Sequence, residues 1–461
     1  MKSILKTTML AASFSVALGG SIAPLQAQSL ADTLIAAYRN SNLLEQNRAL
    51  LRAADEDVAV AVASLRPVVN FVTEAQQRIT NNPAQPDSLT LGFNLAAEVT
   101  LIDFGRGRLA QEAAKAQVLA TRQALVSVEQ GVLLDAIAAH LDMRTTAEAV
   151  ALQQTTQRVI TQELSAARER FELGEVTRTD VALAEARLAA ARSSLAAAEG
   201  DLAVAREAYK LATGIYPDQL RAPPALPRTA VNLQTAQDIA RRTHPSVLEA
   251  QHNVAAAEFN AERVAAQRHG SVTGSASIGR QFGGAAGDTT SANAGVRYAR
   301  PIYQGGQLSA LSRQAIARRD AARSGLHQTV AQVVQNVAVA WANVDVASAR
   351  IAASQQQVRA SQTAFEGTRE EARLGARTTL DVLNAETDLL NARTQLLQAQ
   401  AGQQIATYNL LAAMGLLTVD HLGLGIPTYD AEAYFNAVRN APVSSPQGEA
   451  LDRVLQSIGR Q

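Results

Sequence analysis

The stretch that decides the fold is Leu173-Gly174-Glu175-Val176-Thr177-Arg178-Thr179-Asp180-Val181. A shift of 201 positions brings it onto Leu374-Gly375-Ala376-Arg377-Thr378-Thr379-Leu380-Asp381-Val382, with Leu, Gly, Thr, Asp and Val in the same places. The same shift superimposes Ala184-Glu185 on Ala385-Glu386 and Gly214 on Gly415. Offsets of 199 and 204 relate earlier segments, so insertions between the two copies are small. A unit of about 200 residues that occurs twice indicates an internal duplication and not a short-period solenoid.

The composition excludes several classes of protein. The 461 residues include 42 Lys+Arg and 42 Asp+Glu. A net charge of zero argues against a nucleic-acid binder, which needs a basic face to neutralise phosphates. The chain has no cysteine, which rules out disulfides, thiol nucleophiles, thiolate zinc sites and a lipid anchor on an N-terminal Cys.

Residues 1–27 have the pattern of a secretory signal peptide. Lys2 and Lys6 form a positive start, a short apolar stretch follows, and Ala27 precedes the expected cleavage point. The alternative is an N-terminal membrane anchor, for which the apolar stretch is too short. In the rest of the chain, the longest uncharged stretch, 394–419, is too rich in Gln and Asn to span a bilayer. We therefore expect an exported protein that crosses a membrane, if at all, with strands.

Each repeat is expected to contain the same helices. Ala, Leu, Gln, Glu and Arg dominate these segments at helical spacing, and no proline lies between Pro86 and Pro217 or between Pro301 and Pro427. The long helices would measure roughly 100 Å at ~1.5 Å per residue. We expect 179–213 to stack on 235–268, and 380–414 to stack on 30–65. The predicted helices span 30–65, 104–171, 179–213, 235–268, 303–373 and 380–414.

Two pairs of alternating segments separate these helices. In the clearest of them, Leu89, Leu91 and Phe93 alternate with Thr90 and Gly92, as in a strand with one apolar face. An ordinary half-buried sheet packed on helices fits this alternation, and so does a membrane-spanning barrel. Four strands cannot close a barrel, but three chains would supply twelve. The predicted strands span 66–79, 88–101, 271–282 and 291–302.

This pattern resembles the TolC family of outer-membrane channel proteins over essentially the whole mature chain. The motifs that carry the resemblance are the two 201-shifted stretches above and the strand-to-helix passages Leu101-Ile102-Asp103-Phe104-Gly105-Arg106-Gly107 and Pro301-Ile302-Tyr303-Gln304-Gly305-Gly306. The resemblance implies an α+β fold: a homotrimeric channel with a twelve-stranded transmembrane β-barrel, four strands per chain. The barrel would continue into a long periplasmic twelve-helix α-barrel, girdled by a mixed equatorial belt.

The repeats and the resemblance together suggest a division of the chain. After the signal peptide, the first structural repeat would occupy 28–214 and an equatorial linker 215–234. The second repeat would occupy 235–415, and the equatorial and C-terminal tail 416–461.

The resemblance also implies a function and a location. Family members are passive exit ducts in the outer membrane that extend into the periplasm. A periplasmic adaptor and an inner-membrane ABC or proton-driven pump supply energy and cargo, which is secreted protein, small toxic compounds or both. The expected partners are thus two further copies, adaptor, pump and outer-membrane lipid, with no nucleic acid and no cofactor. The alternative is a periplasmic coiled-coil scaffold or adaptor that conducts nothing.

A periplasmic gate is implied where the helices turn, at the two tips that contain Gly174 and Gly375. In the family, a basic residue of the second tip pairs with an acidic residue of the first tip and closes the pore. Val176 aligns with the basic residue in the first repeat, so only one tip has this lock. The alternative for the basic residue is an exposed surface ion pair, and for the aspartates it is helix capping. The implied gate residues are Thr179, Asp180, Arg377, Asp381 and Asn384.

Nothing in the chain indicates an enzyme. The six histidines show no metal-ligand spacing, and His244 and His252, eight apart, are too distant for an i, i+4 pair. The glycines Gly283, Gly284 and Gly287 join two strands and open no helix, so they mark a loop and not a phosphate site. Carboxylates alternate with Arg along the helices, as on a solvated face.

Overall fold

The computed structural model describes residues 28–79, 87–283, 287–442, 449 and 453. The expected signal peptide, 1–27, and parts of both strand-connecting loops and of the tail lie outside the described residues. The elements in chain order are α1 (Leu30–Asn40), α2 (Asn42–Ala63), β1 (Val68–Arg78), β2 (Ser88–Ile102), α3 (Arg106–Glu172), α4 (Arg178–Thr213), α5 (Leu233–Thr243), α6 (Pro245–Ala266), a 3₁₀ turn (Gln267–His269), β3 (Ser271–Gly283), β4 (Thr289–Ala299), α7 (Gln307–Arg373), α8 (Thr379–Ala413) and α9 (Ala431–Val438).

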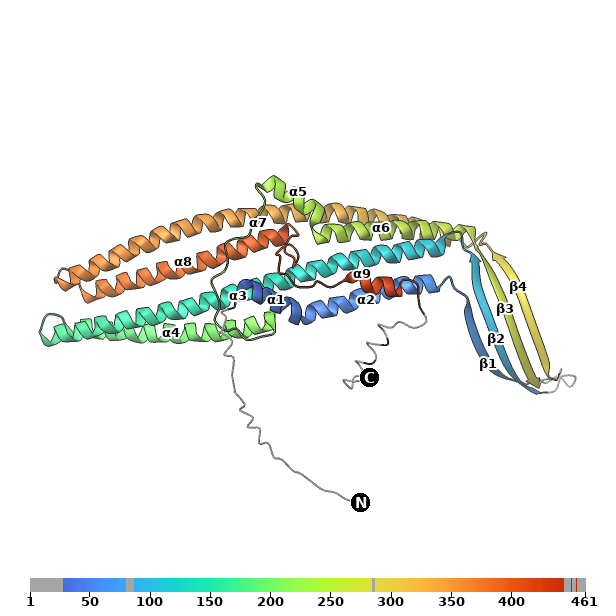
Figure 1. Ribbon diagram of the computed structural model, residues 1–461, viewed down its shortest axis with the longest axis horizontal. Coiled ribbons are helices and arrows are strands. Elements are labelled where there is room, and N and C mark those ends of the chain that lie inside the picture. Colours follow the sequence, from blue (N-terminus) through green and yellow to red (C-terminus); the bar gives the residue numbers. More distant parts are fainter. Residues whose placement is uncertain (1–27, 80–86, 284–286, 443–448, 450–452, 454–461) are drawn as a thin grey trace, which may run out of the picture.

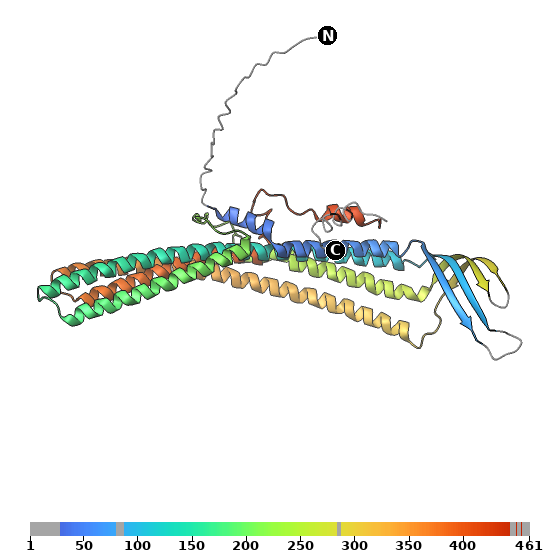
Figure 2. The same ribbon diagram turned by 90° about the horizontal axis from the view of Figure 1, so that it is seen from below.

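The molecule is long, with the sheet at one end and two helical hairpin tips at the other (Figure 1). From the sheet to the middle, the helices lie in the order α2, α3, α6, α7, and from the middle to the tips in the order α4, α3, α8, α7. Seen from below, these helices form one curved layer, with α1 and α9 on the same side of it (Figure 2). The chain is therefore a four-column segment of a wall.

The long helices α3 and α7 match the predicted 104–171 and 303–373. Each has 67 residues, which corresponds to ~100 Å of helix. Both begin after a left-handed glycine, Gly105 at φ +86° and Gly306 at φ +85°. Both end at a second left-handed glycine, because only a residue without Cβ adopts this conformation without strain.

Two of the predicted helices are each broken in two, contrary to the single helices expected over 30–65 and 235–268. The first break is at Ser41, whose hydroxyl accepts a hydrogen bond from the Leu44 amide at 3.3 Å and so caps α2. The second is at His244, which precedes Pro245 at the first position of α6. A proline disfavours the helical conformation of the residue before it, so both breaks have a local cause.

The predicted stacking of the shorter helices was wrong. The Asn40 side-chain amide at the end of α1 donates to the Thr213 carbonyl at 2.8 Å, so α4 stacks on the α1–α2 pair. The Thr243 hydroxyl donates to the Met414 carbonyl at 3.0 Å, so α8 stacks on the α5–α6 pair. Each column therefore stays within its own repeat. The reason is connectivity, because α4 follows α3 after a short turn and α2 is joined to α3 through the β1–β2 hairpin, so both pack along the same helix.

The four strands form one antiparallel sheet in the order β1-β2-β3-β4. They agree with the predicted bounds to within two residues, except that the fourth ends at Ala299 and not at 302, because Pro301 has no amide to donate to a ladder. All residues of β1 and β4 are exposed in the single chain. Among them are the large apolar side chains of Phe71, 67% exposed, and Val296, 70% exposed.

The main apolar core lies at the middle of the molecule, where α1, α3 and α8 meet the chain that follows α8. By length and composition alone, one described helix, α3, could cross a membrane, whereas the sequence had suggested none. Its Leu133, Ile137 and Leu141 are buried in this core, so packing within the molecule accounts for its apolar composition.

The helix α9, which the sequence analysis did not foresee, lies against α2. The Tyr434 hydroxyl donates to Glu56 Oε1 at 2.7 Å. Next to it, the Arg66 guanidinium donates to the carbonyls of Asn440 and Ala441. These contacts fasten the C-terminal segment to the first repeat.

Candidate functional site

The two hairpin tips have the same local structure. Gly174 and Gly375 both adopt φ +79°, which turns the chain out of the long helix. Three residues after each glycine, a threonine begins the return helix. The Gly-x-x-Thr spacing therefore encodes the turn and the start of the next helix together.

Asp180 and Asp381 are capping residues. The Asp180 carboxylate accepts hydrogen bonds from the Thr177 amide at 2.9 Å and the Thr177 hydroxyl at 2.8 Å. Asp381 accepts the same pair from Thr378, at 3.0 and 2.8 Å. These bonds, the backbone one first, lower the pKa of both carboxyls. Both aspartates therefore stay ionised at the helix starts, in the role that capping alone would require.

Arg377 pairs within its own tip in the single chain. Its Nε donates to Glu371 Oε2 at 2.9 Å, and this hydrogen bond raises the pKa of Arg377. Both side chains are about half exposed. Among the described residues, no ion pair joins Arg377 to Asp180, and Thr179 is exposed. The sequence analysis did not identify Glu371 as a partner. A signal was present, because Glu371 lies six residues before Arg377, on the other side of the same tip turn.

A direct contact links the two tips through Asn384. The Arg187 guanidinium on α4 donates to Asn384 Oδ1 on α8 at 2.9 Å. The structure thus brings one of the expected gate residues to the junction between the hairpins, with a partner that the sequence analysis missed.

A buried polar layer joins the hairpins above the tips. Glu386 on α8 is 5% exposed and accepts a hydrogen bond from the Thr156 hydroxyl on α3 at 3.2 Å. Burial raises the pKa of the Glu386 carboxyl. Close by, Arg369 on α7 pairs with Glu163 on α3 at 3.2 Å. Repeat matching had already aligned Glu185 with Glu386, which was a signal for a shared role, but the sequence alone did not identify the partners.

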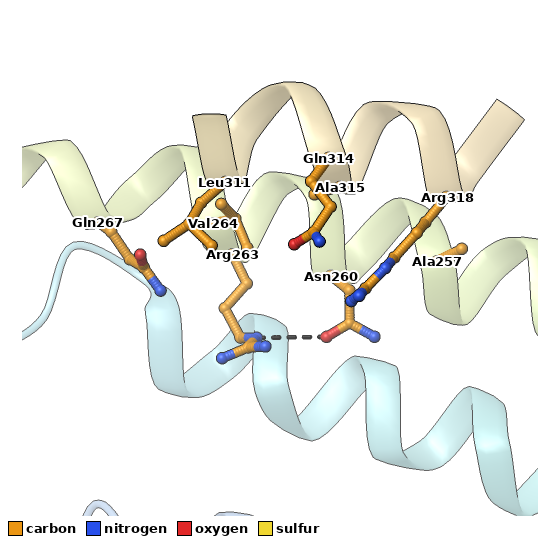
Figure 3. A pocket seen from close by; sticks show the side chains of 9 residues that line it. All are labelled: Ala257, Asn260, Arg263, Val264, Gln267, Leu311, Gln314, Ala315 and Arg318. Carbon is orange, nitrogen blue, oxygen red and sulfur yellow. Dashed lines mark hydrogen bonds between the residues drawn. The ribbon is translucent and has the colours of Figure 1, made fainter. Parts of the chain in front are cut away.

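The other hollows and ionisable groups do not suggest catalysis. A groove of about 530 Å³ lies between α6 and α7, where the Arg263 guanidinium donates to Asn260 Oδ1 at 3.2 Å (Figure 3). Its lining, all of it in the described part of the chain, has neither a carboxylate nor a histidine. Over the same part of the chain, no group of three or more His, Asp or Glu side chains is placed to hold a metal ion.

One buried histidine has a structural role. His140 Nδ1 lies 2.8 Å from the Thr33 hydroxyl, and burial lowers the pKa of His140 to about 4. The ring is therefore neutral at physiological pH and joins α1 to α3.

Comparison with known proteins gives a consistent answer. The outer membrane efflux protein family matches residues 34–214 and 237–416. Outer membrane efflux protein BepC of Brucella suis biovar 1 (strain 1330) is 33% identical over 432 residues, which cover 92% of this chain and 94% of BepC. The Campylobacter jejuni CmeC outer membrane channel has a similar structure, with a TM-score of 0.75 and 15% identity, over 96% of this chain and 98% of CmeC. The outer membrane protein VceC of Vibrio cholerae has a TM-score of 0.71 and 22% identity, over 84% of this chain and 96% of VceC.

These likenesses confirm three of the expectations. The fold class is that of a trimeric channel whose β-barrel continues into a helical barrel. The protein is located in the outer membrane. Its family is one of channels and not of enzymes. On the extent of both matches, the chain belongs to the outer membrane efflux protein family.

Proposed function

We propose that three copies of this chain form the exit duct of a tripartite export system, which passively conducts cargo from a periplasm-spanning pump complex to the exterior. The observation that carries the proposal is that the sheet of a single chain has two edge strands, β1 and β4, each with one unpaired edge. Within the described residues, β1 pairs only with β2, and β4 only with β3. Unpaired strand edges in a membrane are satisfied by closing a barrel.

The helices fit the same arrangement. The chain supplies four columns side by side: α2 with α4, α3, α6 with α8, and α7 (Figure 1). Three chains would supply twelve columns of ~100 Å. A duct of this length fits a conduit through the periplasm that meets an adaptor and an ABC or proton-driven pump at its tips.

The gate of this duct would consist of the tip residues. The exposed pair of Arg377 with Glu371 is one that solvent weakens, so Arg377 is able to exchange Glu371 for Asp180 when the tips close together. Threefold symmetry would place three Asp381 carboxylates around a narrow pore, which is a natural cation site. Thr179 and Asn384 would line the same constriction.

The cargo follows from the family in part. The relative BepC is named an efflux protein, which supports small toxic compounds as cargo. Secreted protein from a type I system is the second class that such a duct would carry. Complementation of an efflux-deficient strain, measured as restored resistance to toxic compounds, tests the first class, and complementation of a type I secretion mutant, measured as secreted protein in the medium, tests the second.

Charge reversal at Arg377 tests the gate. We expect Arg377→Glu to raise the single-channel conductance of the purified protein in planar bilayers, because the lock would become repulsive towards Asp180. The matched control is Arg359→Glu, which makes the same charge change on α7 away from the tips and should conduct like the parent. Unchanged conductance of Arg377→Glu would remove the lock from the proposal. A monomer in the soluble periplasmic fraction would favour the scaffold.

A further inference from the structure

One arginine and one glutamate recur at equivalent positions of the two repeats. In the first repeat, the Arg168 guanidinium donates to Glu185 Oε1 at 2.6 Å. A shift of 201 turns these residues into Arg369 and Glu386. In the second repeat, no ion pair joins Arg369 to Glu386 among the described residues, and Arg369 pairs with Glu163 of α3 instead. The duplication has therefore preserved the same two residue types on both hairpins, with different ion-pair partners.

The surroundings of the two pairs differ sharply. The Glu185 side chain is 51% exposed, whereas Glu386 is 5% exposed. What covers Glu386 is α3 of the other repeat, whose Thr156 hydroxyl donates to it at 3.2 Å. The same helix supplies Glu163, which pairs with Arg369 at 3.2 Å. Thr156 and Glu163 thus form the surface that receives the second pair.

The counterpart of this receiving surface lies on α7. Shifting Thr156 and Glu163 by 201 gives Gln357 and Ala364, and both are exposed. In Figure 1, α3 lies between α4 and α8, whereas α7 lies at the edge of the wall with α8 on one side only. Within the part of the chain that the structure describes, no helix of the second hairpin covers Arg168 and Glu185. Likewise, no arginine–glutamate pair of the first hairpin packs on Gln357 and Ala364 of α7. The two exposed surfaces are therefore equivalent to the two sides of the buried α8–α3 junction.

We propose that in the assembled channel the Arg168–Glu185 pair of one subunit docks on Gln357 and Ala364 of the neighbouring subunit. This inference rests on the proposed trimer and names the residues that join its subunits. The α8–α3 junction inside the chain is repeated as an α4–α7 junction between chains. Around a wall of twelve columns, junctions within a hairpin (α3–α4 and α7–α8) then alternate with junctions between hairpins (α8–α3 and α4–α7).

The chemistry at the new junction is complementary. The Gln357 amide is a hydrogen-bond donor and takes the place of the Thr156 hydroxyl opposite a glutamate. Ala364 replaces Glu163, so the neighbouring subunit offers no carboxylate to draw Arg168 away. Within the single chain, Arg168 pairs with Glu185 at 2.6 Å, whereas Arg369 reaches across to Glu163. Small residues around Ala364, including Ala360 and Gly367, allow the helices to approach closely.

A disulfide crosslink tests the junction directly, because the chain has no cysteine of its own. The double variant Glu185→Cys/Gln357→Cys should form covalent dimers and trimers on oxidation in outer membranes, seen on non-reducing gels. Each single variant should give none. The register control is Glu185→Cys with Arg350→Cys, one heptad away on α7, which should crosslink poorly. The positional control Thr156→Cys/Glu386→Cys should close a disulfide within one chain and give no ladder.

A charge swap provides a second test without new cysteines. Gln357→Glu places two carboxylates face to face, so the trimer should dissociate at a lower temperature on gels. Adding Glu185→Gln restores an amide–carboxylate pair in the reverse order and should recover the parent temperature.

The outcomes separate this inference from the proposed function. A heat-resistant, conducting trimer that crosslinks at Arg350→Cys and not at Gln357→Cys, or in which the charge swap has no effect, overturns the junction and leaves the channel standing. A chain that remains monomeric by analytical ultracentrifugation overturns both.

Discussion

The long helices α3 and α7 have the same length and the same start and end, yet their surroundings are different. Each has 67 residues, follows a left-handed glycine and ends at a Leu-Gly turn. Nineteen residues of α3 are buried, against six of α7. The shared sequence pattern therefore fixes the length and the ends of both helices, whereas the neighbouring helices determine how many of their residues are buried. α3 has helices of its own chain on both sides, and the second neighbour of α7 would come from another subunit.

The largest expected effect is that of a core truncation, which should cost much more stability in α3 than at the equivalent position of α7. Leu133 on α3 is fully buried, and its counterpart 201 residues later is the half-buried Val334 on α7. Leu133→Ala should lower the free energy of unfolding of the single subunit by about 2–5 kcal/mol, because it leaves a cavity. Val334→Ala should cost less than about 1 kcal/mol there. Urea unfolding of dilute, dissociated subunits in detergent measures both, and equal losses would contradict the edge position of α7.

The next largest expected effect on stability comes from replacing a buried carboxylate, Asp55, at a position where the two repeats have different residues. Asp55 on α2 is fully buried, and neither of its oxygens accepts a hydrogen bond from a residue that the structure describes. Burial raises the pKa of Asp55 to about 6, while the charge of Arg122 opposes the rise and that of Glu56 adds to it. With an offset of 204, the second repeat has Phe259 at this position.

The sign of the pH dependence follows from this raised pKa. The folded state holds the Asp55 proton more tightly than the unfolded state, so this residue costs stability once pH rises from about 4 through about 6. Asp55→Asn should therefore raise the free energy of unfolding by roughly 3 kcal/mol at pH 8, since 1 pKa unit corresponds to ~1.4 kcal/mol. The gain should shrink towards zero at pH 4. A loss of stability at pH 8 would show that the carboxylate is satisfied when charged.

The smallest expected effect concerns the tips, where the repeats agree. Thr177 and Thr378 cap α4 and α8 with the same hydrogen bonds. Thr177→Ala and Thr378→Ala should each cost about 1 kcal/mol of local stability. Amide hydrogen exchange in the first turns of the two helices measures this cost. The lowered pKa values of Asp180 and Asp381 mean that both caps persist at neutral pH and weaken only as pH falls through those values. Unequal losses at the two tips would show that a tertiary contact supports one of them.

Local chemistry made much of the fold predictable. Long runs without proline predicted the two long helices, and the glycine-containing turns of the duplicated motif predicted the tips. The helix breaks at Ser41 and before Pro245 could also have been predicted from the sequence, because a capping serine and a proline act on their immediate neighbours. They were missed since apolar periodicity continues across both positions.

Partnerships between distant residues were not predictable. The short helices stack within their own repeats through Asn40 with Thr213 and Thr243 with Met414, and the sequence analysis paired them the other way. Arg377 contacts Glu371, whereas its pairing with Asp180 remains a prediction for the assembled channel. Long arginine side chains reach several partners, so spacing along the chain does not select among them.

The sequence by itself determined the duplication, the helix and strand types, the tip turns and the aspartate caps, because each depends on residues a few positions apart. The tertiary structure decided which columns stack, which of the two long helices lies inside the wall and which of two equivalent glutamates is buried. Those outcomes depend on what packs against a helix. The duplication makes Glu185 and Glu386 alike in sequence, and only the packing of a helix from the other hairpin against Glu386 makes their surroundings different.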